Sequence, residues 1–175
     1  MLNQLKNKLI NAYSKSDLQV LNKIESILTF DNFNSKVALK LGELIVEIAG
    51  EDRNEVAIII IRESDKACIF QYIGEGKSQR NIDFAMKKRN TVIYTKHSSL
   101  WAMVKEVVDG GLNDVFNVEN ECLPVGGAFP IIVNGELVAT VAVSGLKNGE
   151  DHLLIIKALC RYLKKEIPEF SAPLI

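Results

Sequence analysis

Apolar residues recur every three or four positions in several stretches of the chain, and this spacing predicts amphipathic α-helices. The stretches are 2–13, 17–28, 35–49, 78–89, 98–108 and 150–166. Asp17, Ser78 and either Ser98 or Ser99 stand where an N-cap residue is expected. Gly50 follows the third stretch and is the expected C-terminal stop.

Other stretches have the pattern of strands. Residues 56–61 are apolar on both faces, which is typical of a central strand covered from both sides. Residues 67–73 return after a RESD turn and are expected to pair with it antiparallel. Residues 91–95 are β-branched and predict a short linker or strand, and residues 112–123 predict an irregular polar connection in which a short strand is left open.

The run GGAFPIIVNGELVATVAVSGLKNGEDH (126–152) contains the strongest local signal. Asn134-Gly135 separates two apolar alternating segments, and a type I′ turn needs a positive φ at both of its central residues. A β-hairpin is therefore predicted here. With the other elements, it indicates an α+β fold in which helices pack on an antiparallel sheet of about five strands.

The first two helices carry apolar stripes that need a partner. We divide the chain into an N-terminal helical extension, residues 1–28, and a domain, residues 29–175. The stripes have two readings, packing on the parent domain or contact with another subunit. Four or five leucines left in water would form a patch that soluble monomers rarely tolerate, so we expect a homo-oligomer with residues 1–28 in its interface.

Composition excludes several classes of protein. The 175 residues carry a net charge of −1, which leaves no basic field for nucleic acid or for an anionic membrane. The longest apolar runs are strand-sized, so no transmembrane helix is expected, and no signal peptide is recognised. Cys68, Cys122 and Cys160 lie far apart and form no CxxC pair, which argues against disulfides or a zinc site and favours a reducing cytoplasm. We expect each to be a small buried hydrophobe.

Two glycine motifs are candidate ligand-binding sites. GEGKS (74–78) fails as a Walker A loop because Gln71 stands where a glycine is required. It remains either an anion site with Lys77 or a plain strand-to-helix turn. Gly126-Gly127 would either let a flat ligand or an anion approach the backbone, or form a bend at the entry to a strand.

His97 and His152 are the only histidines, so an imidazole ligand to any metal must be one of them. The alternative is that each caps or packs locally. Asn81, Lys88 and Arg89 could line a polar pocket or form a solvated helix face. No nucleophilic triad and no metal cluster emerges, so no catalytic residue is assigned and an enzymatic role stays open.

The 126–152 run resembles the GG-x-PI…dG…VSG…D run of the haem-degrading-domain family, HbpS/GlcG type. Phe129 and the EDH start of the last helix are more similar to an uncharacterised branch of that family. Upstream agreement with the branch includes FDNFN (30–34), Leu41-Gly42, Asn81 with Phe84, Lys88 and Ser98-Ser99, although the branch more usually has Trp at the position of Phe84.

The resemblance covers residues 28–167 and implies a profilin-like αβα sandwich and oligomeric assembly. It further implies binding or degradation of haem in some members, and relatives attached to corrinoid enzymes. The candidate ligand-binding residues are Asn81, Lys88, His97, Ser98, Gly126, Gly127 and His152.

Three functions are open on this basis. The first is binding of haem or a similar flat anionic cofactor. On this reading haemin gives a Soret shift that His97→Ala or His152→Ala abolishes. The second is a non-catalytic oligomeric scaffold or accessory protein that binds another protein. The third is an enzyme acting on a small anionic metabolite.

Overall fold

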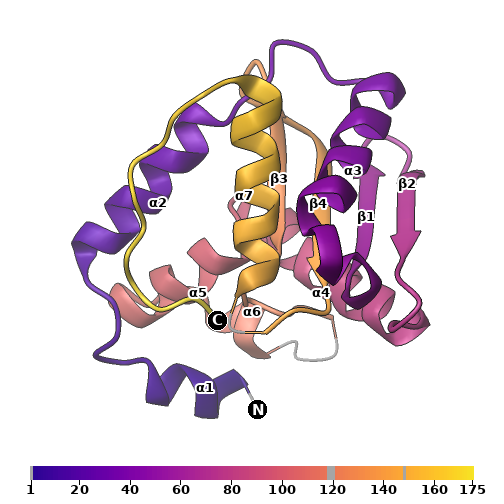
Figure 1. Ribbon diagram of the computed structural model, residues 1–175. Coiled ribbons are helices and arrows are strands. Elements are labelled where there is room, and N and C mark those ends of the chain that lie inside the picture. Colours follow the sequence, from indigo (N-terminus) through magenta and orange to yellow (C-terminus); the bar gives the residue numbers. More distant parts are fainter. Residues whose placement is uncertain (1, 118–120, 148) are drawn as a thin grey trace.

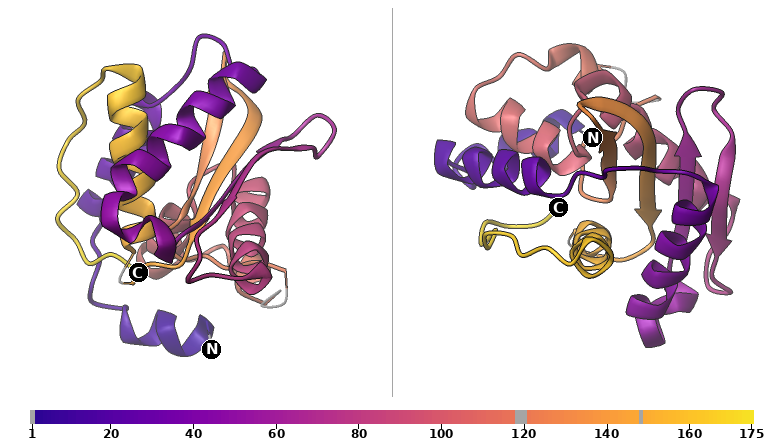
Figure 2. Two further views of the ribbon diagram at one scale, coloured as in Figure 1. Left: turned by 45° about the vertical axis from the view of Figure 1, so that its right-hand side comes forward. Right: turned by 90° about the horizontal axis from the view of Figure 1, so that it is seen from above.

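The computed structural model describes residues 2–117, 121–147 and 149–175. Its centre is a four-stranded antiparallel sheet in the order β2-β1-β4-β3. The strands are β1 (Ala57–Arg62), β2 (Cys68–Ile73), β3 (Ala128–Val133) and β4 (Glu136–Ser144). Figures 1 and 2 show helices on both faces of this sheet. The expected α+β class is confirmed.

β1 is central, as its two-sided apolar pattern predicts, because it pairs with β2 on one side and β4 on the other. Ile58 and Ile60 point toward α3 (Ser35–Ala49) and α7 (Glu150–Leu163). The alternate residues of β1 pack toward α4 (Gln79–Thr95). The period of two along a strand thus divides the interior into two apolar layers.

The expectation of about five strands is wrong, because residues 91–95 continue α4 as a helix. Thr91 and Val92 are fully buried there. A β-branched residue costs a helix less than about 0.7 kcal/mol, whereas burial of a valine side chain stabilises by about 1.5–3 kcal/mol. Packing on the sheet therefore outweighs propensity. Residues 113–117 form the short helix α6 (Asn113–Asn117) rather than a strand, and 118–120 lie outside the described residues.

The β3–β4 hairpin is confirmed. Asn134 has φ 50° and Gly135 φ 82°, the two positive values that a type I′ turn requires. Phe30 adds a short parallel bridge to Val133, and its N–H donates to the carbonyl of Ile132 at 2.9 Å. The chain entering α3 is thereby fixed to the free edge of β3.

The N-terminal region consists of α1 (Leu2–Lys8) and α2 (Lys15–Ile27). The first helix ends five residues earlier than its apolar pattern predicts, at Lys8. The N-cap of α2 is Ser14 rather than Asp17. Its hydroxyl accepts from the N–H of Asp17, and the Asp17 carboxylate accepts from the N–H of Ser14 at 2.7 Å. This reciprocal arrangement is a capping box, in which Asp17 is the third helical residue.

The leucine stripes of α1 and α2 are buried within the chain. They meet α5 (Ser99–Val108), and the shared cluster includes Leu2, Leu9, Leu18 and Leu21 together with Leu100, Trp101 and Met103. The reading as packing on the parent domain is therefore correct, and the wet leucine patch that motivated an oligomer is absent from the described residues. The homo-oligomer itself stays a prediction.

The remaining chain is irregular. A 3₁₀ turn, η1 (Gly50–Glu55), follows α3, and Gly50 stops α3 with φ 57° as expected. α7 ends at Leu163, and residues 165–175 are extended (Figure 1). Tyr13 Oη donates to the carbonyl of Pro173 at 2.7 Å, which ties this tail to the N-terminal region.

The expected burial of the cysteines is confirmed for Cys122 and is wrong for Cys68. Cys122 is buried, Cys160 is half-buried and Cys68 is exposed, because Cys68 lies on the edge strand β2. No helix among the described residues is long and apolar enough to span a bilayer.

Candidate functional site

A buried ion pair lies where α4 passes the start of α7. Lys88 Nζ donates to Asp151 Oδ2 at 2.7 Å and to the carbonyl of Val143 at 3.1 Å. Asp151 Oδ1 accepts from the N–H of Leu146 at 2.9 Å. Both charged side chains are 6% exposed. The pair ties α4 to the end of β4 and to α7, since its hydrogen bonds reach all three elements.

The Gly126-Gly127 step packs directly on this pair. Gly127 has φ 123°, and a Cβ there would lie 2.6 Å from Lys88 Nζ. Gly126 donates its N–H to the carbonyl of Ile175 at 2.5 Å, and a Cβ there would lie 3.0 Å from that of His152. The glycines thus allow a close backbone approach, but the groups that approach belong to the protein itself. These contacts support the interpretation of Gly126-Gly127 as a bend at the entry to β3.

His152 lies next in sequence to Asp151 and is 3% exposed. Burial, with a smaller contribution from the charge of Lys88, lowers its pKa to about 4. Its Nδ1 is buried and has no hydrogen-bond partner among the described residues. The imidazole is therefore neutral at physiological pH, and its ring centroid lies 6.3 Å from that of Phe129.

Asn81 lies at the rim of the same region. It lines an open pocket of about 320 Å³ together with Phe84, Lys88 and Asp151. Its Oδ1 accepts from the N–H of Ser78 at 3.2 Å, so the side chain of Asn81 caps the N-terminus of α4. The candidates Asn81, Lys88, Gly126, Gly127 and His152 are therefore close together in the fold. The ion-pair partner of Lys88, Asp151, was not among the candidates, although the EDH start of the last helix contains it.

His97 and Ser98 lie elsewhere, at the junction of α2 with α5. His97 Nδ1 lies 2.6 Å from Glu25 Oε2, and its ring stacks on Trp101 at a centroid distance of 3.8 Å. The N–H of Ser98 donates to Glu25 Oε1 at 2.8 Å. The local packing role is thus the reading that the contacts of both residues support.

GEGKS is a plain turn. The N–H of Gly74 donates to the carbonyl of Val56 at 2.9 Å, and that of Gly76 to Asn54 at 2.8 Å. Lys77 pairs with Glu55 at 2.8 Å. Both glycine N–H groups and the ammonium are engaged within the chain, so little remains to hold an anion.

A larger cavity, of about 610 Å³, opens at the opposite end of the sheet. It lies between the start of α3, the β1–β2 turn, the first residues of β4 and the end of α4. Its apolar wall residues are Phe33, Ile69, Ile93, Leu137 and Val138, and the charged residues that line it are Arg62, Glu63, Lys66 and Lys96. We call it the hairpin-end cavity.

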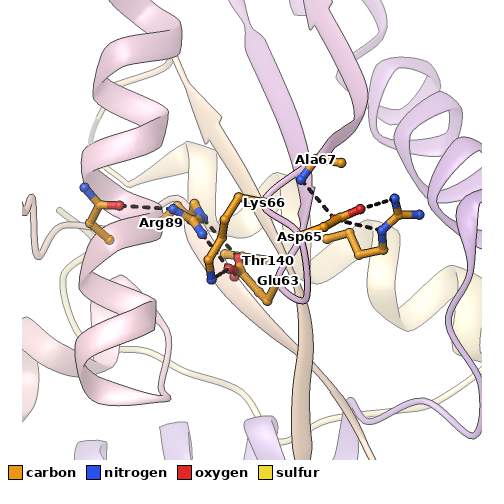
Figure 3. A network of polar contacts seen from close by, with 8 residues as sticks. Glu63, Asp65, Lys66, Ala67, Arg89 and Thr140 are labelled. Carbon is orange, nitrogen blue, oxygen red and sulfur yellow. Dashed lines mark hydrogen bonds and ion pairs between the residues drawn. The ribbon is translucent and has the colours of Figure 1, made fainter.

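Glu63 is the centre of the polar network at this cavity (Figure 3). Oε1 accepts from Arg89 Nε at 3.0 Å and from Thr140 Oγ1 at 2.9 Å, and Oε2 pairs with Lys66 Nζ at 3.0 Å and with Arg89 Nη2. Burial raises the pKa of this carboxyl, but the hydrogen bonds from Arg89, Lys66 and Thr140 outweigh burial and lower its pKa overall. Glu63 is therefore an anion whose charge is compensated.

The positively charged residues at the hairpin-end cavity differ in whether an acidic side chain pairs with them. Arg62 Nε donates to Asp65 Oδ1 at 2.9 Å, and Asp65 in turn accepts from the N–H of Ala67 (Figure 3). Lys96 ends α4 in the left-handed conformation, with φ 62°, and is exposed. Its ammonium makes no hydrogen bond or ion pair with any described residue. Lys96 is therefore a free positive charge at the rim of an apolar cavity.

Comparison with known proteins places this geometry in context. The family described as "Haem degrading protein HbpS-like" matches residues 33–160. A UPF0303 protein of Paraburkholderia phymatum is 34% identical over 150 residues, which cover 84% of this chain and 90% of that protein. A UPF0303 protein of Rhizobium etli is 32% identical over 154 residues, which cover 87% and 93%.

Solved structures share the fold. The Ybr137w protein matches with a TM-score of 0.75 at 27% identity, over 93% of this chain and 98% of that one. HbpS matches with a TM-score of 0.59 at 19% identity, over 75% and 90%. A PduOC:haem complex matches with a TM-score of 0.61 at 16% identity, over 78% and 99%.

Proposed function

The chain belongs to the HbpS-like haem-degrading family, and on that premise we propose that it binds a flat, largely apolar anion of the tetrapyrrole class in the hairpin-end cavity. The observation that carries the proposal is the pairing of apolar walls with the free ammonium of Lys96 at the rim. A tetrapyrrole such as haem has the matching chemistry, an apolar ring that bears carboxylates at one edge.

Size and polarity support this choice. Small-molecule sites are commonly about 300–1,000 Å³, lined by apolar side chains with a few convergent polar groups. The cavity of about 610 Å³ falls within that range. The pocket beside Lys88 is smaller, at about 320 Å³, and the charge of Lys88 is already compensated by Asp151. The hairpin-end cavity is therefore the better candidate for an anion with a large apolar surface.

The solved relatives add support of a general kind. One structure of the same fold is a haem complex of PduOC. The apolar walls and Lys96 match the chemistry of the ring and its carboxylates, but none of the described residues that line the cavity is a histidine, cysteine, methionine or tyrosine that could ligate haem iron. The proposal is for that reason one of binding, and no degradative step is assigned to these residues.

The test is a titration of the purified full chain with haemin and with metal-free protoporphyrin IX, followed by absorbance. We expect stoichiometric binding that weakens about tenfold in Lys96→Glu, because an exposed ion pair contributes up to about 1 kcal/mol and the new carboxylate adds repulsion. Lys23→Glu, at an exposed position of α2, is the matched control and should bind as the wild type does. Binding no tighter than that of an unrelated protein would refute the proposal.

A further inference from the structure

We infer that ligand recognition in the hairpin-end cavity is independent of iron, so that a metal-free porphyrin binds as tightly as haemin. This inference rests on the proposed function and adds to it the chemical feature that is recognised. On this inference the protein binds the apolar ring and its carboxylates, and no side chain ligates the metal. Histidines are the usual imidazole ligands of haem iron.

Neither histidine is placed to ligate iron in this cavity. His152 lies at the other end of the sheet, 3% exposed beside the Lys88–Asp151 pair. His97 stacks on Trp101 at 3.8 Å, and its Nδ1 is engaged by Glu25. A carboxylate partner can orient an imidazole toward a metal, but among the described residues that line the cavity neither histidine is present.

The other common iron ligands are also missing from the cavity wall. None of its described residues is a cysteine, a methionine or a tyrosine. Cys68 precedes the wall residue Ile69 on β2, where the pairing with β1 is bulged, and it is not among the residues that line the cavity. Its thiol donates to the carbonyl of Phe70 at 3.2 Å. Proximity in sequence therefore does not bring this sulfur into the cavity.

Glu63 is the one acidic residue among those that line the cavity, and its oxygens are already in use. A carboxylate offers about four lone-pair sites. Two on Oε1 are taken by Arg89 and Thr140, and two on Oε2 by Arg89 and Lys66. Ligation of iron would require at least one of these contacts to break in a region where the carboxylate is only 7% exposed. The ammonium and guanidinium groups of the cavity have no lone pair to offer.

What remains available is attraction to the organic part of the ligand. The apolar walls can cover a ring, and the free ammonium of Lys96 can pair with a carboxylate. Both interactions are the same for a porphyrin with and without iron. The expected dissociation constants therefore differ little between haemin, zinc protoporphyrin and metal-free protoporphyrin IX.

The experiment compares these three compounds with the full-length wild type and with the His97→Gln and Lys96→Glu variants. We expect dissociation constants within about threefold of one another for the wild type. We also expect an absorption spectrum of bound haemin that lacks the features of an imidazole complex and acquires them when free imidazole is added. His97→Gln keeps a side chain that can bond Glu25, and it should leave the affinity and the spectrum unchanged, whereas Lys96→Glu should weaken all three ligands alike.

The possible failures are distinguishable. If haemin binds more than about tenfold tighter than the metal-free compound, or shows an imidazole-ligated spectrum in the wild type without added imidazole, the inference is overturned while the proposed function stands. If none of the three compounds binds, the proposed function falls and the inference falls with it. The spectrum of the wild type decides the question even if a variant fails to fold.

Discussion

Acidification should destabilise this protein through the buried imidazole of His152. Burial lowers the pKa of the imidazole from 6.5 to about 4. Between pH 4 and pH 6.5 the imidazole of His152 is protonated in the unfolded chain and neutral in the folded chain. Because stability rises with pH wherever the unfolded state binds more protons, the contribution of His152 is complete above pH 6.5 and is lost as the pH falls toward 4.

The size of the effect follows from the shift. A difference of 2.5 pKa units corresponds to about 3 kcal/mol in full, and the part lost between pH 7 and pH 5 is about 2 kcal/mol. That is a large fraction of the 5–15 kcal/mol that stabilises a typical domain. The effect is not one of surface charge, since the imidazole is 3% exposed.

Urea unfolding at several pH values between 5 and 7, followed by the fluorescence of the single tryptophan, Trp101, measures this contribution. His152→Leu should lose most of the pH dependence in that window, because the replacement binds no proton in either state. His97→Gln removes the other imidazole and should keep the dependence due to His152. Equal free energies of unfolding at pH 7 and pH 5, or an unchanged slope in His152→Leu, would refute the reasoning.

Four further predictions concern packing and assembly. Gly127→Ala should cost about 1–3 kcal/mol more in urea unfolding than Gly110→Ala, because both glycines have positive φ but only the first would place a Cβ against Lys88 and Val143; equal costs would contradict the close approach. Lys88→Met should cost about 3–5 kcal/mol because it leaves Asp151 buried and unpaired, and Lys88→Met with Asp151→Leu should recover part of the loss; a mild single mutant would argue against a buried pair. Light scattering on the full chain should show a mass above that of the monomer, as the predicted homo-oligomer requires, and a monomer would end that prediction. A chain starting near Ser26 should lose its cooperative unfolding transition, because it lacks Leu2, Leu9, Tyr13, Leu18 and Leu21, which are buried in the cluster around α5; a stable truncated fold would contradict that burial.

Local signals predict local structure well in this chain. The Asn134-Gly135 turn, the Gly50 stop and the Ser78 cap are each determined by the φ or the side chain of one residue, and all three are confirmed. Residues 91–95 show the limit of such signals. Their β-branched composition weakly favours a strand. Burial of Val92 against the sheet stabilises the helical conformation more strongly.

The sites are harder to predict because their partners are distant in sequence. Lys88 and Asp151 are 63 residues apart, and His97 and Glu25 are 72 apart, so spacing along the chain carries no sign of either pair. The hairpin-end cavity is lined by residues 33–35, 62–64, 66, 69, 93, 96 and 137–138, and none of these segments contains a recognisable ligand-binding motif. The glycine pair at 126–127 is locally visible, but only the fold shows that it accommodates Lys88.

The most direct test of where a ligand binds is an NMR titration of the isotope-labelled full chain with metal-free protoporphyrin IX, which causes no paramagnetic broadening. We predict that the amide signals of Ser35, Lys96 and Leu137, at the hairpin-end cavity, shift in a saturable manner. The signals of Ser144 and Asp151, at the opposite end of the sheet, should stay in place. Shifts confined to Ser144 and Asp151, or no saturable shift at all, would contradict the assignment of the hairpin-end cavity as the ligand site.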